Sequence, residues 1–249
     1  MQPSTPRPEI QSDAHDADPR RRWLLQALSA GWLVGGTGWA RADTFGAVPR
    51  KLPEGKSIFQ IDGDVRVNGR RASRSTLLNP GDVIETGSDG RLVGVIGRDA
   101  LILRPQSRLE IGGAASVARG FFRLVNGAML SVFGKRDDTY EIRTPVATIG
   151  IRGTGVYTEA DAEKSYVCLC YGTADLTPVN RPEEQQRLTT THHEQPMFLY
   201  GDATAGKHMA PAPFFNHTDL ELMTLEALVG RTVPFAVPED PYAMPRREY

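Results

Sequence analysis

Two cysteines and the histidines that follow them are the residues of this chain whose types and spacing could do chemistry. Cys168 and Cys170 are the only cysteines among the 249 residues, and they lie in the run 166–171, which reads as a strand. Residues two apart in a strand point to the same face, so both thiols are expected to project together. A disulfide between them is disfavoured, because two strand residues span about 6.6 Å and their Cβ vectors run nearly parallel.

The histidines downstream could complete a metal site with these thiols. Two thiolates with one or two imidazoles suit a four-ligand zinc ion, or a copper ion that prefers soft sulfur. His192 and His193 are adjacent and would point to opposite faces of an extended chain, so at most one of them is expected to serve. The candidate metal ligands are Cys168, Cys170, His192, His193 and His217.

The alternative is that the cysteines are small core residues of a strand and the histidines are polar surface groups, and the sequence leaves both open. No enzyme is predicted. His193-Glu194 lacks the second histidine of a zinc-hydrolase motif, and no Ser-His-Asp grouping can be deduced.

Arg152 is the one charged residue within 144–157, a stretch of β-branched residues broken by a proline and three glycines. We expect a strand end, a crossing connection and a new strand there. Arg152 is a candidate binding residue for a partner or an anion. Its alternative role is to hold the carbonyl groups of the neighbouring loop.

Short β-rich runs separated by turn residues extend from about residue 57 to 176, without a helical period. They predict an all-β fold, either a sandwich or an open barrel. Hairpins are expected around Asn68-Gly69, around Gly97, and around Asn126-Gly127.

Ordered motifs in this β region resemble the FecR domain. They are Leu78-x-x-Gly81-Asp82-Val83-Ile84-Glu85-Thr86-Gly87, Ser88-Asp89-Gly90-Arg91-Leu92, Leu124-x-x-Gly127 and Thr144-Pro145-x-Ala147-x-x-x-Ile151-Arg152-Gly153-Thr154. The resemblance implies an extracytoplasmic β domain like that of the FecR-type regulators, which relay receptor occupancy in the outer membrane to a sigma factor. It implies binding and signalling without catalysis. Those regulators also carry a cytoplasmic helical region and a membrane helix, whereas residues 1–22 here are too short and polar to bind a sigma factor, so we expect a freestanding FecR-like module.

The amino-terminal residues 1–42 read as an export signal. Arg21-Arg22-Trp23-Leu24-Leu25-Gln26 resembles the twin-arginine motif, although Arg20 stands where Ser or Thr is usual. The following run, 23–40, is uncharged but diluted by glycines, and a small-x-small cleavage pattern ends it at 40–42. A general secretory signal and a retained anchor are the alternatives, but the run is too weakly apolar for a stable membrane span.

A capping box, Thr218 to Glu221, predicts a short carboxy-terminal helix with an apolar stripe of Leu222, Leu225, Leu228 and Val229. We expect this stripe to pack on the β domain, or else to meet a partner. The expected organisation is a signal peptide (1–42), a linker (43–56), the FecR-like β domain (57–200), a second linker (201–217), the helix (218–230) and an extended tail (231–249).

Charge and composition limit the possible partners. The chain has 29 basic and 30 acidic residues, so no basic surplus favours nucleic acid or an anionic membrane. We expect a periplasmic protein that binds an envelope protein or a small ligand. A metal- or redox-binding protein, with zinc or copper on the candidate ligands, is the alternative.

Overall fold

The computed structural model describes residues 48–113, 120–135, 140–204 and 206–236. The chain divides into two units, Met1–Asp43 and Thr44–Tyr249, and the fold described below is that of the second. The predicted signal peptide lies outside the described residues, as does the tail beyond residue 236. Among the residues described, no helix is both long and apolar enough to cross a membrane.

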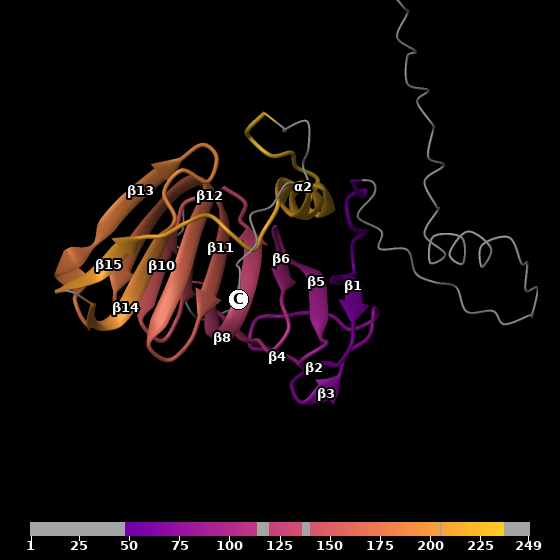
Figure 1. Cartoon of the computed structure of the whole chain (residues 1–249). Helices are drawn as coiled ribbons and strands as arrows, with labels where there is room; N and C mark the ends of the chain where they lie inside the picture. The colour runs from indigo at the N-terminus through magenta and orange to yellow at the C-terminus, as the bar shows by residue number, and fades with distance from the viewer. Residues whose placement is uncertain (1–47, 114–119, 136–139, 205, 237–249) are drawn as a thin grey trace, which may run out of the picture. The chain divides into compact units, whose positions relative to one another are not determined.

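The described fold is all-β with one short α-helix near its carboxyl end, as predicted (Figure 1). The strands are β1 (Ile58–Asp62), β2 (Val65–Val67), β3 (Arg70–Arg71), β4 (Val83–Thr86), β5 (Arg91–Ile96), β6 (Asp99–Leu103), β7 (Arg108–Gly112), β8 (Phe121–Val132), β9 (Tyr140–Arg143), β10 (Ala147–Ile151), β11 (Gly155–Ala160), β12 (Lys164–Pro178), β13 (Gln186–Thr190), β14 (Met197–Thr204) and β15 (Lys207–Pro211). The helices are the 3-10 helix η1 (Pro182–Glu184) and the α-helix α2 (Asp219–Leu228).

Two long strands, β8 and β12, each pair in two layers, and this closes the sheet into a barrel-like arrangement. The second half of β8 pairs with β6 and β11, and the first half of β12 pairs with β11 and β14. We call this the helix-side layer, because α2 packs against β6 and β8. In the other layer, which we call the far layer, the first half of β8 pairs with β7 and β9. The second half of β12 pairs there with β10 and β13.

Two hydrophobic cores follow from this arrangement. The first contains inward side chains of both layers, such as Leu101, Phe122 and Leu169, and lies between them. The second lies on the outer face of the helix-side layer and contains the helix residues Leu222, Leu225 and Leu228. The predicted apolar stripe of α2 therefore packs on the β domain.

A glycine with positive φ stands where each long strand passes from one layer to the other. These are Gly127 in β8 (φ 92°) and Gly172 in β12 (φ 95°). The hairpin predicted around Asn126-Gly127 is wrong, because β8 continues through this position. Instead of a turn, β8 has a β-bulge opposite Arg108 and Leu109 of β7, where the register of the two strands shifts. The hairpins predicted around Asn68-Gly69 and Gly97 are present as β2–β3 and β5–β6.

The linker predicted at 201–217 is also wrong in its first part. β14 extends to Thr204, and after a turn at Gly206 (φ 77°) the chain returns as β15. Pro211 ends β15 at an edge of the sheet, where a missing N–H group breaks no ladder. The remaining residues lead directly into α2, whose capping box forms: Glu221 N–H donates to Thr218 Oγ1 at 3.2 Å, and Thr218 N–H donates to Glu221 Oε2 at 3.1 Å.

Gly127→Ala tests the crossing in β8. An alanine there meets both a positive φ and the side chain of Ser107, whose Oγ lies 2.1 Å from the position of the added Cβ. We expect the free energy of unfolding to fall by about 2 to 4 kcal/mol. Urea unfolding measures it, with Gly97→Ala as the control, because Gly97 also has a positive φ but has open space around it. Equal losses in the two variants would contradict the role of Gly127.

Candidate metal centre

Strand β12 carries both cysteines on the outer face of the helix-side layer. Cys168 and Cys170 belong to the core under α2, while the alternating Val167 and Leu169 belong to the core between the layers. Both cysteines are fully buried, and both are free thiols. The alternation of β12 thus directs the two thiols to one place, as the sequence pattern predicts.

Two histidines from other segments meet this pair of thiols. His193 lies in the loop between β13 and β14, has a φ of 55°, and its backbone N–H donates to the Cys170 carbonyl. His217 lies directly before the Thr218 cap of α2 and is fully buried, with its ring stacked on Tyr157 at 4.6 Å. Loop and helix therefore each bring one imidazole to the thiols of the strand.

The donor atoms are close enough to share one ion. Cys168 Sγ lies 3.5 Å from His193 Nδ1, and His193 Nδ1 lies 3.2 Å from His217 Nε2. One donor atom from each of Cys168, Cys170, His193 and His217 lies within 4.8 Å of all the others. We call these four residues the Cys/His cluster.

The outer ring nitrogens of both histidines are engaged away from the cluster. His193 Nε2 lies 3.0 Å from Asp219 Oδ1, and His217 Nδ1 lies 2.9 Å from the Phe215 carbonyl oxygen. A carboxylate or carbonyl on the outer nitrogen is the usual support of a metal-ligating histidine, because it fixes the tautomer and the ring orientation.

Protonation within the cluster is strongly perturbed. Burial alone would raise the pKa of the Cys168 thiol, but hydrogen bonds from Cys170, His193 and His217 hold this pKa well below its usual value. Burial would lower the pKa of His193, but its hydrogen bonds to Asp219 and Cys168 raise it to about 9. Burial and the neighbouring Cys168 raise the pKa of Cys170 well above its usual value. The two cysteines and His193 thus shift one another's pKa values within the cluster.

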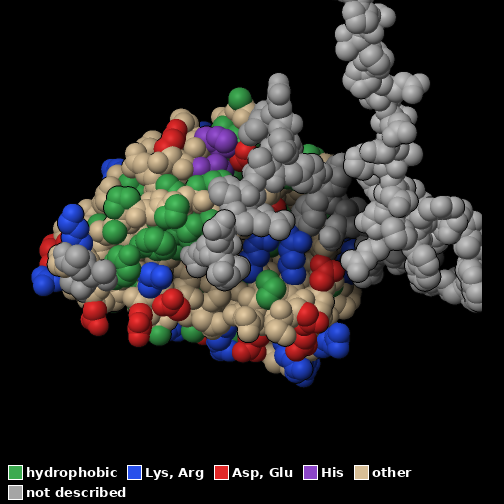
Figure 2. Space-filling view, in the orientation of Figure 1, with side chains coloured by type: hydrophobic (Ala, Val, Ile, Leu, Met, Phe, Trp, Pro, Cys, Tyr) green, Lys and Arg blue, Asp and Glu red, His purple; other side chains and the backbone are tan. Residues whose placement is uncertain are grey.

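His192 lies next to the Cys/His cluster but outside it. Its Nε2 contacts both carboxylate oxygens of Asp219, at 2.9 and 3.0 Å, and its ring packs on Phe235 at 4.4 Å. Figure 2 shows histidine side chains gathered at one place on this face. Asp219, which joins the two adjacent histidines, was not identified from the sequence. Its only signal was its place two residues after His217, at the first position of the predicted helix.

Arg152, the candidate binding residue, lies away from the cluster. Its side chain is 62% exposed, and its Nε lies 3.6 Å from Asp175 Oδ2 on β12, which also pairs with Arg187. Neither expected role, a partner contact or a hold on loop carbonyls, is tested by this geometry, and the binding role stays a prediction.

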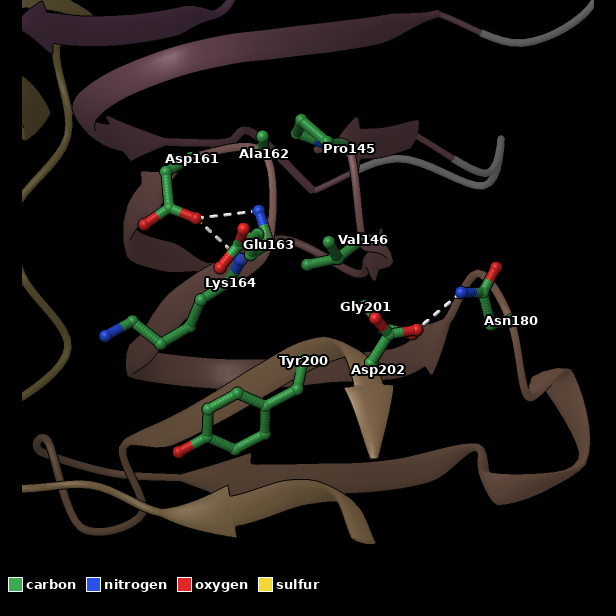
Figure 3. A pocket seen from close by; sticks show the side chains of 10 residues that line it. All are labelled: Pro145, Val146, Asp161, Ala162, Glu163, Lys164, Asn180, Tyr200, Gly201 and Asp202. Carbon is green, nitrogen blue, oxygen red and sulfur yellow. Dashed lines mark hydrogen bonds between the residues drawn. The ribbon is translucent and has the colours of Figure 1, made fainter. Parts of the chain in front are cut away.

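An open hollow on another part of the surface is lined by acidic residues (Figure 3). Asp161 there already accepts hydrogen bonds from the backbone N–H groups of Glu163 and Lys164, at 2.8 and 2.6 Å. Across the hollow, Asn180 donates to the Gly201 carbonyl oxygen. Asp161 and Asn180 thus hold a turn and strand β14, and no member of the Cys/His cluster lines the hollow.

Comparison with known proteins gives one family match. Residues 82–174, from β4 to the middle of β12, match the family described as FecR protein. A search of curated proteins found no match. Among solved structures, two crystal structures of a candidate anti-sigma factor from Parabacteroides distasonis are similar to this chain. The first is 12% identical with a TM-score of 0.44, and the aligned region covers 56% of this chain and 70% of the chain in that structure. The other has 13% identity and a TM-score of 0.44, and covers 59% of this chain and 74% of its own.

Thiol labelling tests the burial of the cysteines. Because Cys168 and Cys170 are fully buried, a polar thiol reagent should reach them only when the fold opens. We expect labelling of the native chain to be at least about tenfold slower than labelling in urea. Ser88→Cys, at an exposed turn, provides the control thiol and should react at once. Fast native labelling at Cys168 or Cys170 would contradict the buried site.

Proposed function

We propose that this chain is an exported, non-enzymatic FecR-like module that binds or senses a component of the cell envelope. The observation that carries this proposal is the FecR match over residues 82–174, which falls on the strands that build both layers. The resemblance brings with it a role in binding and signalling. The partner is an envelope protein or a small ligand, and the balanced charge of the chain argues against nucleic acid.

The chemistry of the Cys/His cluster supports a non-enzymatic role. A nucleophilic cysteine must be reached by its substrate, and a catalytic zinc ion keeps one coordination position open. Cys168 and Cys170 have no exposed surface, and the cluster supplies four donors, the number that a closed structural zinc site uses. The cluster therefore offers a substrate no place to react.

The export of the chain can be tested through its leader. Residues 1–42, fused to a reporter that is active only outside the cytoplasm, should give an active reporter. Arg21→Lys with Arg22→Lys should abolish this activity, because the twin-arginine route reads the paired guanidinium groups. Arg7→Lys is the matched control. An inactive wild-type fusion would remove the export part of the proposal, and activity retained in the paired variant would assign the leader to the general secretory route.

A second candidate function is metal binding, and the observation that favours it is the convergence of four donor side chains from three segments. Residues that serve only as core or surface groups have no reason to bring two thiols and two inward-facing imidazole nitrogens together. Zinc and copper both accept this donor set. Such an ion would belong to the FecR-like module itself, so the two candidate functions are compatible.

Metal analysis of the purified chain tests the second candidate. We expect about one zinc or copper ion per chain, and loss of this ion in the double variant Cys168→Ser/Cys170→Ser, because serine does not replace a thiolate on either metal. His208→Gln serves as the control, because His208 is a buried histidine that contacts Glu184 and stands outside the cluster. If the purified chain held much less than one ion and the double variant held the same amount, the cysteines would have only a structural role.

A further inference from the structure

We propose that the Cys/His cluster takes one zinc ion in a closed four-ligand site, and that this ion fastens α2 to strand β12. The inference rests on the metal-binding candidate function and names the metal and the element it controls. It follows from the geometry of the donors, from their charge and from the segments that supply them.

The orientation of the two imidazoles calls for a cation between them. With the outer nitrogens donating to Asp219 and to the Phe215 carbonyl oxygen, His193 Nδ1 and His217 Nε2 both present lone pairs to the cluster. These two atoms are 3.2 Å apart. Two lone pairs at this distance repel each other unless a proton or a metal ion lies between them.

The fourth donor distinguishes a metal ion from a proton. A proton shared by His193 and His217 needs only Cys168 as its anionic neighbour. The Cys170 Sγ also belongs to the set of donor atoms that all lie within 4.8 Å of one another. Cys170 Sγ also makes a weak hydrogen bond of 3.6 Å to the Cys168 carbonyl oxygen. A metal ion would bind all four donors.

The distances agree with tetrahedral zinc. Bonds of about 2.3 Å to sulfur and about 2.0 Å to nitrogen place two nitrogen ligands about 3.3 Å apart, and a nitrogen and a sulfur about 3.5 Å apart. The corresponding distances here are 3.2 Å for the two nitrogens and 3.5 Å for Cys168 Sγ and His193 Nδ1. These two distances need almost no change to accept the ion, and all four donors lie within 4.8 Å of one another.

Charge favours zinc over monovalent copper. Two thiolates exactly balance a divalent ion, whereas a monovalent ion leaves one negative charge in the cluster. Cys168, Cys170 and His217 are fully buried, and Asp219 already places a carboxylate against His193. An unbalanced charge in such a place costs several kcal/mol, so the neutral zinc site is preferred.

The ligands come from three separate segments of the fold. Cys168 and Cys170 belong to β12, His193 to the β13–β14 loop, and His217 to the residue before the cap of α2. Asp219, the first residue of α2, supports the His193 ligand from outside. One ion in the cluster therefore ties the amino-terminal end of α2 to the sheet.

α2 is also held by contacts of its own, which begin in its first turn at Glu221. Glu221 pairs with Arg104 at 2.7 Å and with Arg91 at 3.3 Å. Nearer its end, Glu226 accepts a hydrogen bond from Tyr171 and pairs with Arg231. Loss of the ion should therefore loosen the chain around His217 and Asp219 most, and the loosening should spread along the helix only as far as these contacts permit.

Hydrogen exchange with and without zinc tests the proposal on the full chain. The chain is first exported, purified without added metal and analysed for zinc and copper. It is then compared as purified, after treatment with a chelator, and after zinc is restored. We expect about one zinc ion per chain, an increase of at least about tenfold in amide exchange over residues 219–224 after chelation, and recovery with zinc. Exchange in β6 and β8 should change much less.

Variants separate the ligands from their surroundings. His217→Gln should lose the zinc ion and make exchange in α2 insensitive to zinc, whereas His208→Gln should behave like the wild type. Asp219→Asn should keep the ion but weaken its binding about 10- to 100-fold, because it removes the support of a ligand and no ligand itself. The wild-type comparison needs no variant, so it remains decisive if His217→Gln does not fold.

The possible failures are distinguishable. Zinc that binds without protecting α2 would overturn the fastening role, and copper in place of zinc in the purified chain would overturn the choice of metal. In both cases the metal-binding function would stand. A chain without bound metal, whose exchange does not respond to zinc, would overturn this inference together with the metal-binding function, and leave the FecR-like module as the remaining proposal.

Discussion

The structure depends on two strands that each serve two layers. A strand can pass from one layer to the other only where its backbone bends sharply, and Gly127 and Gly172 provide this bend at positive φ. An added Cβ at either position would meet neighbouring atoms closer than 3 Å, the side chain of Ser107 in one case and the Gly153 carbonyl oxygen in the other. The inner core, the pairing of β11 between β8 and β12, and the closure of the sheet all follow from these two crossings.

The position of the Cys/His cluster follows from the crossing in β12. Cys170 lies two residues before Gly172, so both cysteines belong to the half of the strand whose outer face is covered by α2. Beyond the glycine, β12 enters the far layer, and its residues Ala174 and Leu176 face the core between the layers. A shift of one residue in the register of this half of β12 would reverse its faces and direct the thiols away from His193 and His217.

Helix α2 is attached by polar groups as much as by its leucines. Asp219, Glu221 and Glu226 are all buried, and each faces partners on the β domain or the segment after the helix. A short helix gains little stability from its own hydrogen bonds, so its place depends on these contacts and on the apolar surface it covers. A change in the Cys/His cluster would therefore affect the position of α2 more directly than that of any other element described.

Local sequence patterns determined the class of fold and several of its parts. Alternating β-branched residues, turn pairs such as Asn68-Gly69 and the capping box at Thr218 act over a few residues, and so could be read without the fold. The same alternation directed Cys168 and Cys170 to one face. Only the tertiary structure decided that Asn126-Gly127 continues a strand, since the choice between turn and bulge depends on the partner strand β7. It also placed His193, and not His192, beside Cys168, and placed Asp219 against His193. These contacts span more than twenty positions of the chain, and local pattern carries no information at that range.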